Sequence, residues 1–193
     1  MDSRPSAQVV CVLMFVVTFA ACGGGGGDGR TVDTTDTTPP SKLVMDAHVP
    51  QPNGQLKIFT VTPTSGNQST TLTNLPVITL IASAEDQESA IGDLTINGET
   101  SVSCEGTETG RRQDATWVKK ALQSTQPQFS RTVSLNVPLG RQNPTDRPGV
   151  DFIANCPSDM KLTRVSGDFS ASATNGAGKN VRTATFSFAW ARP

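Results

Sequence analysis

Two stretches near the carboxyl end of this chain alternate apolar and polar residues with a period of two. In 162–174 and in 181–190, one side carries aromatic or Ala residues and the other carries mostly Ser and Thr. Successive side chains of a β-strand point to opposite faces, so this pattern predicts two strands of an antiparallel sheet with one wet face. Residues 175–178 (Asn-Gly-Ala-Gly) form the expected turn between them. The apolar side is made of Phe169, Ala171, Ala173, Ala184, Phe186, Phe188 and Trp190.

Four earlier stretches have the same character, namely 56–62, 76–84, 91–97 and 129–138. In 76–84 apolar residues occupy both faces, which predicts a central strand. Asn97-Gly98 is typical of a hairpin turn, with 100–104 as the returning strand. Abundant Thr, 17 Gly and 13 Pro also favour an all-β chain. About seven strands separated by turns predict an antiparallel β-sandwich over 56–193.

The stretch 105–128 fits two interpretations. Ala115, Val118, Ala121 and Leu122 fit a short helix, whereas Trp117 and Ala121 fit a strand equally well.

Two short motifs extend the interpretation to a family. They are Ala84-Glu85-Asp86 through Ser89-Ala90-Ile91, and Ser172-Ala173-Thr174-Asn175 through Ala177-Gly178-Lys179-Asn180. Their residues resemble bacterial immunoglobulin-like modules, which often carry an Ala-x-Asp loop and an Ala-x-Asp/Asn-x-Ala-Gly-Asn turn. The resemblance covers roughly 56–193 and implies an immunoglobulin-like sandwich that serves as a spacer, an adhesin or an accessory binding module. The insert at 105–128 departs from the family pattern.

The amino-terminal run 9–21 is almost wholly apolar. As a helix it would measure about 20 Å, whereas a bilayer core needs about 20 apolar residues. The run is therefore too short to span and matches the apolar region of a signal peptide. Small residues, Ala20 and Ala21, stand next to Cys22.

Phe19-Ala20-Ala21-Cys22 resembles the lipobox of bacterial lipoproteins, with Phe19 where family members usually carry Leu. The resemblance implies that the Cys22 sulfur receives a diacylglycerol, that cleavage leaves Cys22 as the first residue, and that its amino group is acylated, for example with palmitate. Several acyl chains make a stable membrane anchor. Gly23, in place of an Asp, implies sorting to an outer membrane if the cell has one. The alternative is an ordinary secretory signal with an incidental cysteine.

Residues 23–41 are rich in Gly, Asp, Thr and Pro and have too few apolar residues to form a core, which predicts a disordered tether. Residues 42–55, which include His48, Pro50 and Pro52, look like a lead-in. The expected organisation is therefore a signal peptide (1–21), a lipidated cysteine with a flexible linker (22–55) and the β-domain (56–193).

Cys104 and Cys156 are the only cysteines that remain after the signal peptide is removed with Cys11. Thiols of exported domains usually pair, so we expect a disulfide between them; two buried free thiols are the alternative. The sequence predicts no metal site and no cofactor, because there is no Cys-x-x-Cys motif and His48 is the only histidine.

Catalytic chemistry is not expected. A triad would need His48, which stands in the lead-in, and Asp86 and Glu88 belong to a polar loop that is most simply solvated. With 16 basic against 17 acidic residues, nothing suggests a nucleic-acid surface. We therefore expect a non-enzymatic structural or protein-binding module outside the cytoplasm that contacts the membrane through its anchor, with an envelope protein or a glycan as its candidate partner. The alternative is a surface module that binds glycan through Trp117 or Ca²⁺ through the 85–89 loop.

Overall fold

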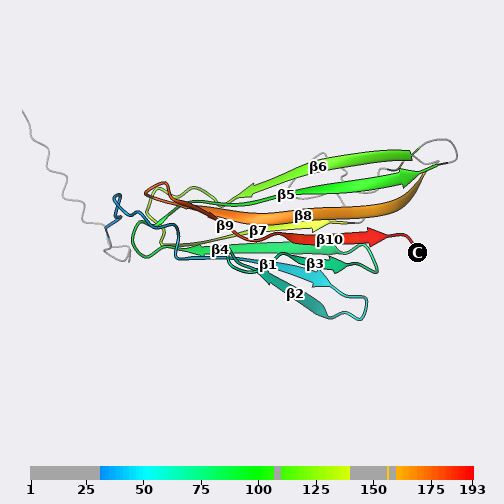
Figure 1. Ribbon diagram of the computed structural model, residues 1–193, viewed down its shortest axis with the longest axis horizontal. Coiled ribbons are helices and arrows are strands. Elements are labelled where there is room, and N and C mark those ends of the chain that lie inside the picture. Colours follow the sequence, from blue (N-terminus) through cyan, green and yellow to red (C-terminus); the bar gives the residue numbers. More distant parts are fainter. Residues whose placement is uncertain (1–30, 107–109, 140–155, 157–159) are drawn as a thin grey trace, which may run out of the picture. The chain divides into compact units, whose positions relative to one another are not determined.

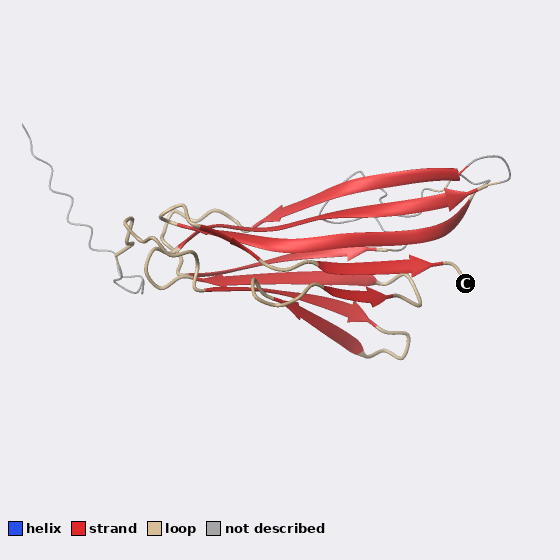
Figure 2. Ribbon diagram, viewed as in Figure 1, coloured by secondary structure: helices blue, strands red, loops and turns tan. Residues whose placement is uncertain are grey.

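The computed structural model describes residues 31–106, 110–139, 156 and 160–193. In this part of the chain every regular element is a β-strand (Figure 2). The strands are β1 (Lys42–Pro50), β2 (Leu56–Val61), β3 (Gln68–Thr71), β4 (Val77–Glu85), β5 (Ile91–Glu105), β6 (Gly110–Lys120), β7 (Ser130–Pro138), β8 (Lys161–Asn175), β9 (Asn180–Arg182) and β10 (Phe186–Ala191). The all-β prediction is confirmed.

The strands form two sheets. The first has the order β2-β1-β4-β7, and the second has the order β3-β10-β8-β5-β6 with β9 paired to β8. Neighbouring strands are antiparallel except β3 and β10, which are parallel. Figure 1 shows the two layers facing each other, which is the arrangement of a β-sandwich.

The core lies between the sheets and comes from the inward side of each strand. In β4 the residues Ile78, Leu80, Ala82 and Ala84 are fully buried, as their alternation predicts. Phe169 of β8 and Phe186 and Phe188 of β10 are buried on the side of the second sheet. Phe59 of β2 contacts Phe186 of β10 with ring centroids 5.3 Å apart, so the two sheets meet through aromatic side chains as well as aliphatic ones.

The domain begins earlier than the sequence suggested. Thr31–Pro193 form one compact unit, and β1 lies between β2 and β4 in the first sheet. The prediction of a linker over 22–55 is therefore wrong from Thr31 onward, because these residues belong to the compact domain. Leu43, Met45, Ala47 and Val49 alternate along β1 and are buried, so this stretch forms a strand although Pro50 ends it.

The expected turn at Asn97-Gly98 is also wrong. Both residues lie within β5, which runs without a turn from Ile91 to Glu105. Gly98 faces Phe169 of β8 across the ladder. A Cβ on Gly98 would lie 2.1 Å from Phe169 Cδ1, so this glycine makes room for an aromatic ring in the core.

Two other stretches are settled by strand pairing. Of the stretch 105–128, for which helix and strand were both open, residues 110–120 with Ala115, Trp117 and Val118 form the edge strand β6, paired along its length with β5. Ala121 and Leu122 follow the end of this strand. The last predicted strand, 181–190, is divided into β9 and β10. At the break Thr183 Oγ1 accepts a hydrogen bond from the Ala171 amide, and the Ala184 amide donates to Thr62 O.

Candidate functional site

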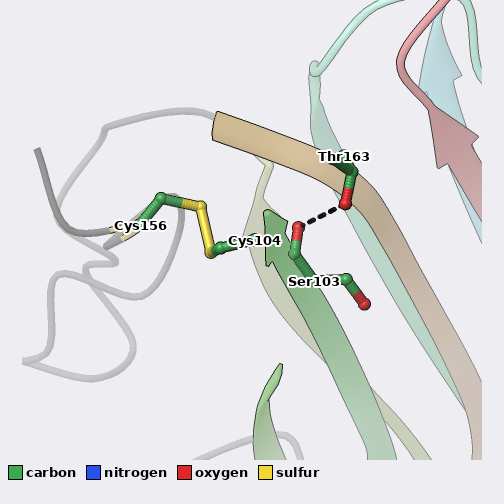
Figure 3. Close-up of a disulfide and its surroundings, with 4 residues drawn as sticks. All are labelled: Ser103, Cys104, Cys156 and Thr163. Atoms are coloured by element: carbon green, nitrogen blue, oxygen red, sulfur yellow. Dashed lines mark hydrogen bonds between the residues drawn. A yellow bond between two sulfur atoms is a disulfide. The ribbon is translucent and has the colours of Figure 1, made fainter. Parts of the chain in front are cut away.

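The predicted disulfide is present. Cys104 near the end of β5 is bonded to Cys156, with an S–S distance of 2.05 Å and a Cα–Cα distance of 5.5 Å (Figure 3). The neighbouring Ser103 O accepts a hydrogen bond of 3.1 Å from Thr163 Oγ1 of β8 (Figure 3). The bridge therefore links Cys156 to the end of β5. The hydrogen bond from Thr163 joins the same end of β5 to β8. Cys22, the predicted lipid-attachment residue, lies outside the described residues.

A buried polar cluster lies at the opposite end of β5. It consists of Asp36, Asp86, Ser89 and Asn175, which are at most 8% exposed, and we name it the clasp. Ser89 Oγ donates to Asp36 Oδ2 at 2.8 Å and lies 3.3 Å from Asp86 Oδ2. Asn175 Nδ2 lies 3.2 Å from each of the same two oxygens. The clasp thus joins the segment before β1, the loop after β4 and the end of β8.

Local turns hold the two carboxylates in place. Asp36 Oδ1 accepts from the Thr38 amide and the Thr38 hydroxyl, at 2.8 and 2.7 Å. Asp86 Oδ1 accepts from the amides of Glu88 and Ser89, both at 2.9 Å. Asn, Asp and Ser are suited to such turns because their short side chains bond nearby backbone groups. Each aspartate therefore organises its own loop and reaches the clasp with its second oxygen.

Backbone contacts reinforce the clasp. The Asp33 amide donates to Glu88 O at 2.9 Å, and the Gly176 amide lies 3.1 Å from Ser89 O and 3.0 Å from Ala90 O. A Cβ on Gly176 would lie 2.2 Å from Ser89 O, so the two loops approach more closely than another residue would permit. Residues 31–41, expected to belong to a disordered tether, are thereby fixed to the sandwich (Figure 1).

Hydrogen bonding favours the ionised form of Asp36 in the clasp. The hydroxyl and the amide of Thr38 lower the pKa of Asp36, and the Ser89 hydroxyl contributes in the same direction. A carboxylate that accepts several hydrogen bonds is stabilised in its ionised form. The oxygens of the clasp are therefore hydrogen-bond acceptors that already have donors, and their evident role is to hold three segments together.

The expectation that Asp86 belongs to a solvated loop is wrong, since Asp86 is 3% exposed. Glu88 is exposed as expected. Among the described residues, no group of three or more His, Cys, Asp or Glu side chains is arranged to hold a metal ion. Calcium binding by the 85–89 loop stays a prediction without a geometric argument.

His48 and the 85–89 loop are not brought together. His48 is half-buried on the outward face of β1, paired with Ile58 and Thr79. It lies six residues along β1 from Lys42, which pairs with Glu85, and six residues of strand measure about 20 Å. The structure therefore offers no triad of His48 with the acids of that loop.

Trp117 is not the exposed platform for a sugar that was considered. It is 1% exposed, and its Nε1 donates to Thr100 Oγ1 at 2.9 Å. Its ring belongs to the core, and Trp117 pairs with Gly98 across the β5–β6 ladder. Trp190, expected in the core, is half-buried and packs against it.

Apolar side chains are exposed on the outward face of the first sheet. Leu56 and Ile58 of β2 are 52% and 53% exposed, and across the ladder they pair with Pro50 and His48 of β1. We name these four residues the β2 face. In the described part of the chain β2 is an edge strand, so the β2 face adjoins backbone groups that no neighbouring strand pairs.

Comparisons with known proteins leave the family open: no family model, no curated protein and no solved structure matches this chain significantly. The described residues contain no helix with the length and apolar character needed to cross a bilayer.

Proposed function

We propose that this protein is a cell-envelope lipoprotein, anchored through Cys22, whose β-sandwich serves as a structural or protein-binding module outside the cytoplasm. The observation that carries this proposal is the stretch Phe19-Ala20-Ala21-Cys22, followed after a short Gly-rich segment by a compact domain that begins at Thr31. In this proposal the module has no catalytic step and needs no cofactor.

The proposed tether is short. Eight residues, 23–30, separate Cys22 from Thr31, and at about 3.5 Å per residue they reach at most about 28 Å. The clasp then connects the segment before β1 to both sheets, because Asp86 follows a strand of the first sheet and Asn175 ends a strand of the second. A force on the anchor would therefore be distributed over the whole sandwich, as suits a structural module.

The order of the strands supports an immunoglobulin-like type. In such sandwiches a sheet containing strands A, B and E packs on a sheet containing C, F and G, and variable-type domains add C′ beside C. The neighbours β1-β4-β7 and β10-β8-β5-β6 correspond to A-B-E and to G-F-C-C′. This chain pairs Cys104 of β5 with Cys156, whereas antibody domains join strands B and F.

The β2 face supports the protein-binding part of the proposal. Exposed apolar side chains that adjoin a free strand edge are a common place for another chain to bind. We expect a double substitution, Leu56→Lys with Ile58→Lys, to abolish in-cell crosslinking to an envelope partner. The matched control is Val118→Lys on β6 of the other sheet, since Val118 is 60% exposed. Unchanged crosslinking in the double variant would remove the β2 face from the proposal.

The anchor is tested by Cys22→Ser in a detergent-partition assay. We expect the variant to leave the detergent phase, because it lacks the sulfur that carries the lipid. Cys11→Ser is the control, since Cys11 belongs to the apolar run that is removed, and it should partition like the wild type. Retention of the Cys22→Ser variant in the detergent phase would exclude a lipid anchor at this residue.

A further inference from the structure

Arg131 occupies an inward position of the first sheet. Along β7 it alternates with exposed residues and shares its face with Val133, Leu135 and Val137, all buried. Arg131 itself is 7% exposed and pairs across the ladder with the buried Ala84. A guanidinium among apolar side chains is costly unless its charge and its N–H groups have partners.

The partners of this guanidinium are incomplete. Nη1 donates to Gly92 O of β5 at 3.1 Å, and the buried Nε has no acceptor among the residues that the structure describes. The ion pairs among the described residues are Lys42–Glu85 and Arg112–Asp114, so no carboxylate of this part of the chain neutralises Arg131. A buried donor without an acceptor destabilises the folded protein.

The free groups lie on one edge of the guanidinium. Nη1 donates to Gly92 O, and the unpaired Nε lies on the edge that it shares with Nη2. Both N–H bonds of that edge point the same way, so it matches the two oxygens of a carboxylate. The same contact would supply the missing negative charge and the missing acceptor.

A hollow with a volume of about 570 Å³ adjoins Arg131. Its walls are the loop 121–128 and residues 130–132 of β7, and none of the described residues that line it is acidic. The volume is within the usual range for sites that bind small molecules, about 300–1,000 Å³. Beside the charged Arg131, side chains with hydroxyl or amide groups line the hollow: Gln123, Ser124, Thr125, Gln128, Ser130 and Thr132.

We propose that this hollow binds a small hydrophilic ligand through its carboxylate, with the Nε–Nη2 edge of Arg131 as the recognising group. Hydroxyls and amides of the wall would bond the remaining polar groups of the ligand. The proposed site includes neither Cys22 nor a residue of the β2 face, so it stands or falls independently of the anchor and of a protein partner.

The test observes the proposed donor directly. In the full chain, ¹⁵N-labelled and kept in detergent, the Nε–Hε resonance of Arg131 is followed while D-glucuronate or N-acetyl-L-glutamate is added. We expect a saturable downfield shift with at least one acid, because a hydrogen bond to a carboxylate deshields Hε. Which acid binds distinguishes a sugar acid from a peptide-like acid. D-glucose is the uncharged control and should leave the resonance in place.

Two variants test the geometry. Arg131→Lys keeps the charge but loses the two-pronged edge, so the affinity for the binding acid, measured by calorimetry, should fall by at least about tenfold. Arg182→Met removes a charge at another site, where the Arg182 Nε already donates to Ser170 Oγ, and should leave the affinity within about twofold.

Three results would overturn the proposal. The first is the absence of a saturable shift with either acid up to about 50 mM, because a dissociation constant above that value is too weak to be useful. The second is an equal shift with D-glucose. The third is an unchanged affinity in Arg131→Lys.

Discussion

Asn175 holds the clasp from the side of the second sheet. Its Nδ2 donates to Thr38 O at 2.8 Å and also approaches both aspartates, while its Oδ1 accepts from the Lys179 amide at 2.8 Å. Asn175→Ala leaves the buried Oδ2 atoms of Asp36 and Asp86 to share the Ser89 hydroxyl, so we expect the free energy of unfolding to fall by about 1–3 kcal/mol. Urea denaturation of both proteins measures the difference.

The control for this substitution is Asn180→Ala. Asn180 is exposed and bonds only the Thr174 hydroxyl among the described contacts, so we expect a change below about 0.5 kcal/mol. Equal effects of the two substitutions would mean that the clasp does not stabilise the fold.

The charge of Asp36 makes the stability depend on pH. The pKa of Asp36 is lowered in the folded protein, chiefly by Thr38. Its contribution is therefore fully present above the unfolded pKa, about 3.9, and is lost as the pH falls through the lower folded pKa. We expect Tm to fall more steeply below about pH 4 in the wild type than in Asp36→Asn. Parallel Tm curves from pH 6 downwards would contradict this.

At the scale of the elements, Gly98 controls the packing of β5 on β8. Because a Cβ there would overlap the ring of Phe169, we expect Gly98→Ala to lower the free energy of unfolding by about 1–3 kcal/mol through overpacking. Gly66→Ala is the matched control, since nothing lies within 4 Å of its added Cβ. If both variants unfold at the same urea concentration, the close contact with Phe169 is unimportant.

The disulfide constrains a long loop. Cys104 and Cys156 are 52 residues apart, and the chain-entropy model gives about 4 kcal/mol for a loop of that size. We expect the Cys104→Ser, Cys156→Ser double variant to lose about that much free energy of unfolding. Peptide mapping without reductant should recover the linked pair from the wild type. Free thiols at both positions in the exported protein would contradict the bridge.

Strands whose alternation is uninterrupted were predictable from the sequence. The buried faces of β4, β7 and β8 follow directly from their period of two. β1 has the same alternation, but the nearby prolines suggested a lead-in. Asn97-Gly98 has the composition of a turn, and only the position of Phe169 across the sheet explains why a glycine is required there.

The clasp could not be predicted in the same way. Ser89 and Asp36 are 53 residues apart, and Asn175 is 139 residues from Asp36. Asp86 and Asn175 did fall within the two motifs that resemble immunoglobulin-like modules, but nothing local showed that they meet. Arg131 was also missed, because an arginine at an alternating position looks like an ordinary interruption until its neighbours are known.

At the scale of the whole molecule, the clasp and the disulfide hold two ends of the described sandwich. A compact sandwich begins at Thr31, its entering segment is fastened by the clasp, and the far end of β5 is fastened by the disulfide. In our proposal the short segment before Thr31 joins this rigid module to a lipid at Cys22.

Mass spectrometry of the amino-terminal peptide tests this proposal most directly. For protein extracted from membranes, we expect a peptide that begins at Cys22 and carries a diacylglycerol on sulfur and an acyl chain on the amino group. Mild alkaline hydrolysis should remove the ester-linked chains and lower the mass accordingly. An amino terminus at any other residue, or an unmodified Cys22 in the membrane-extracted protein, would contradict the lipid anchor.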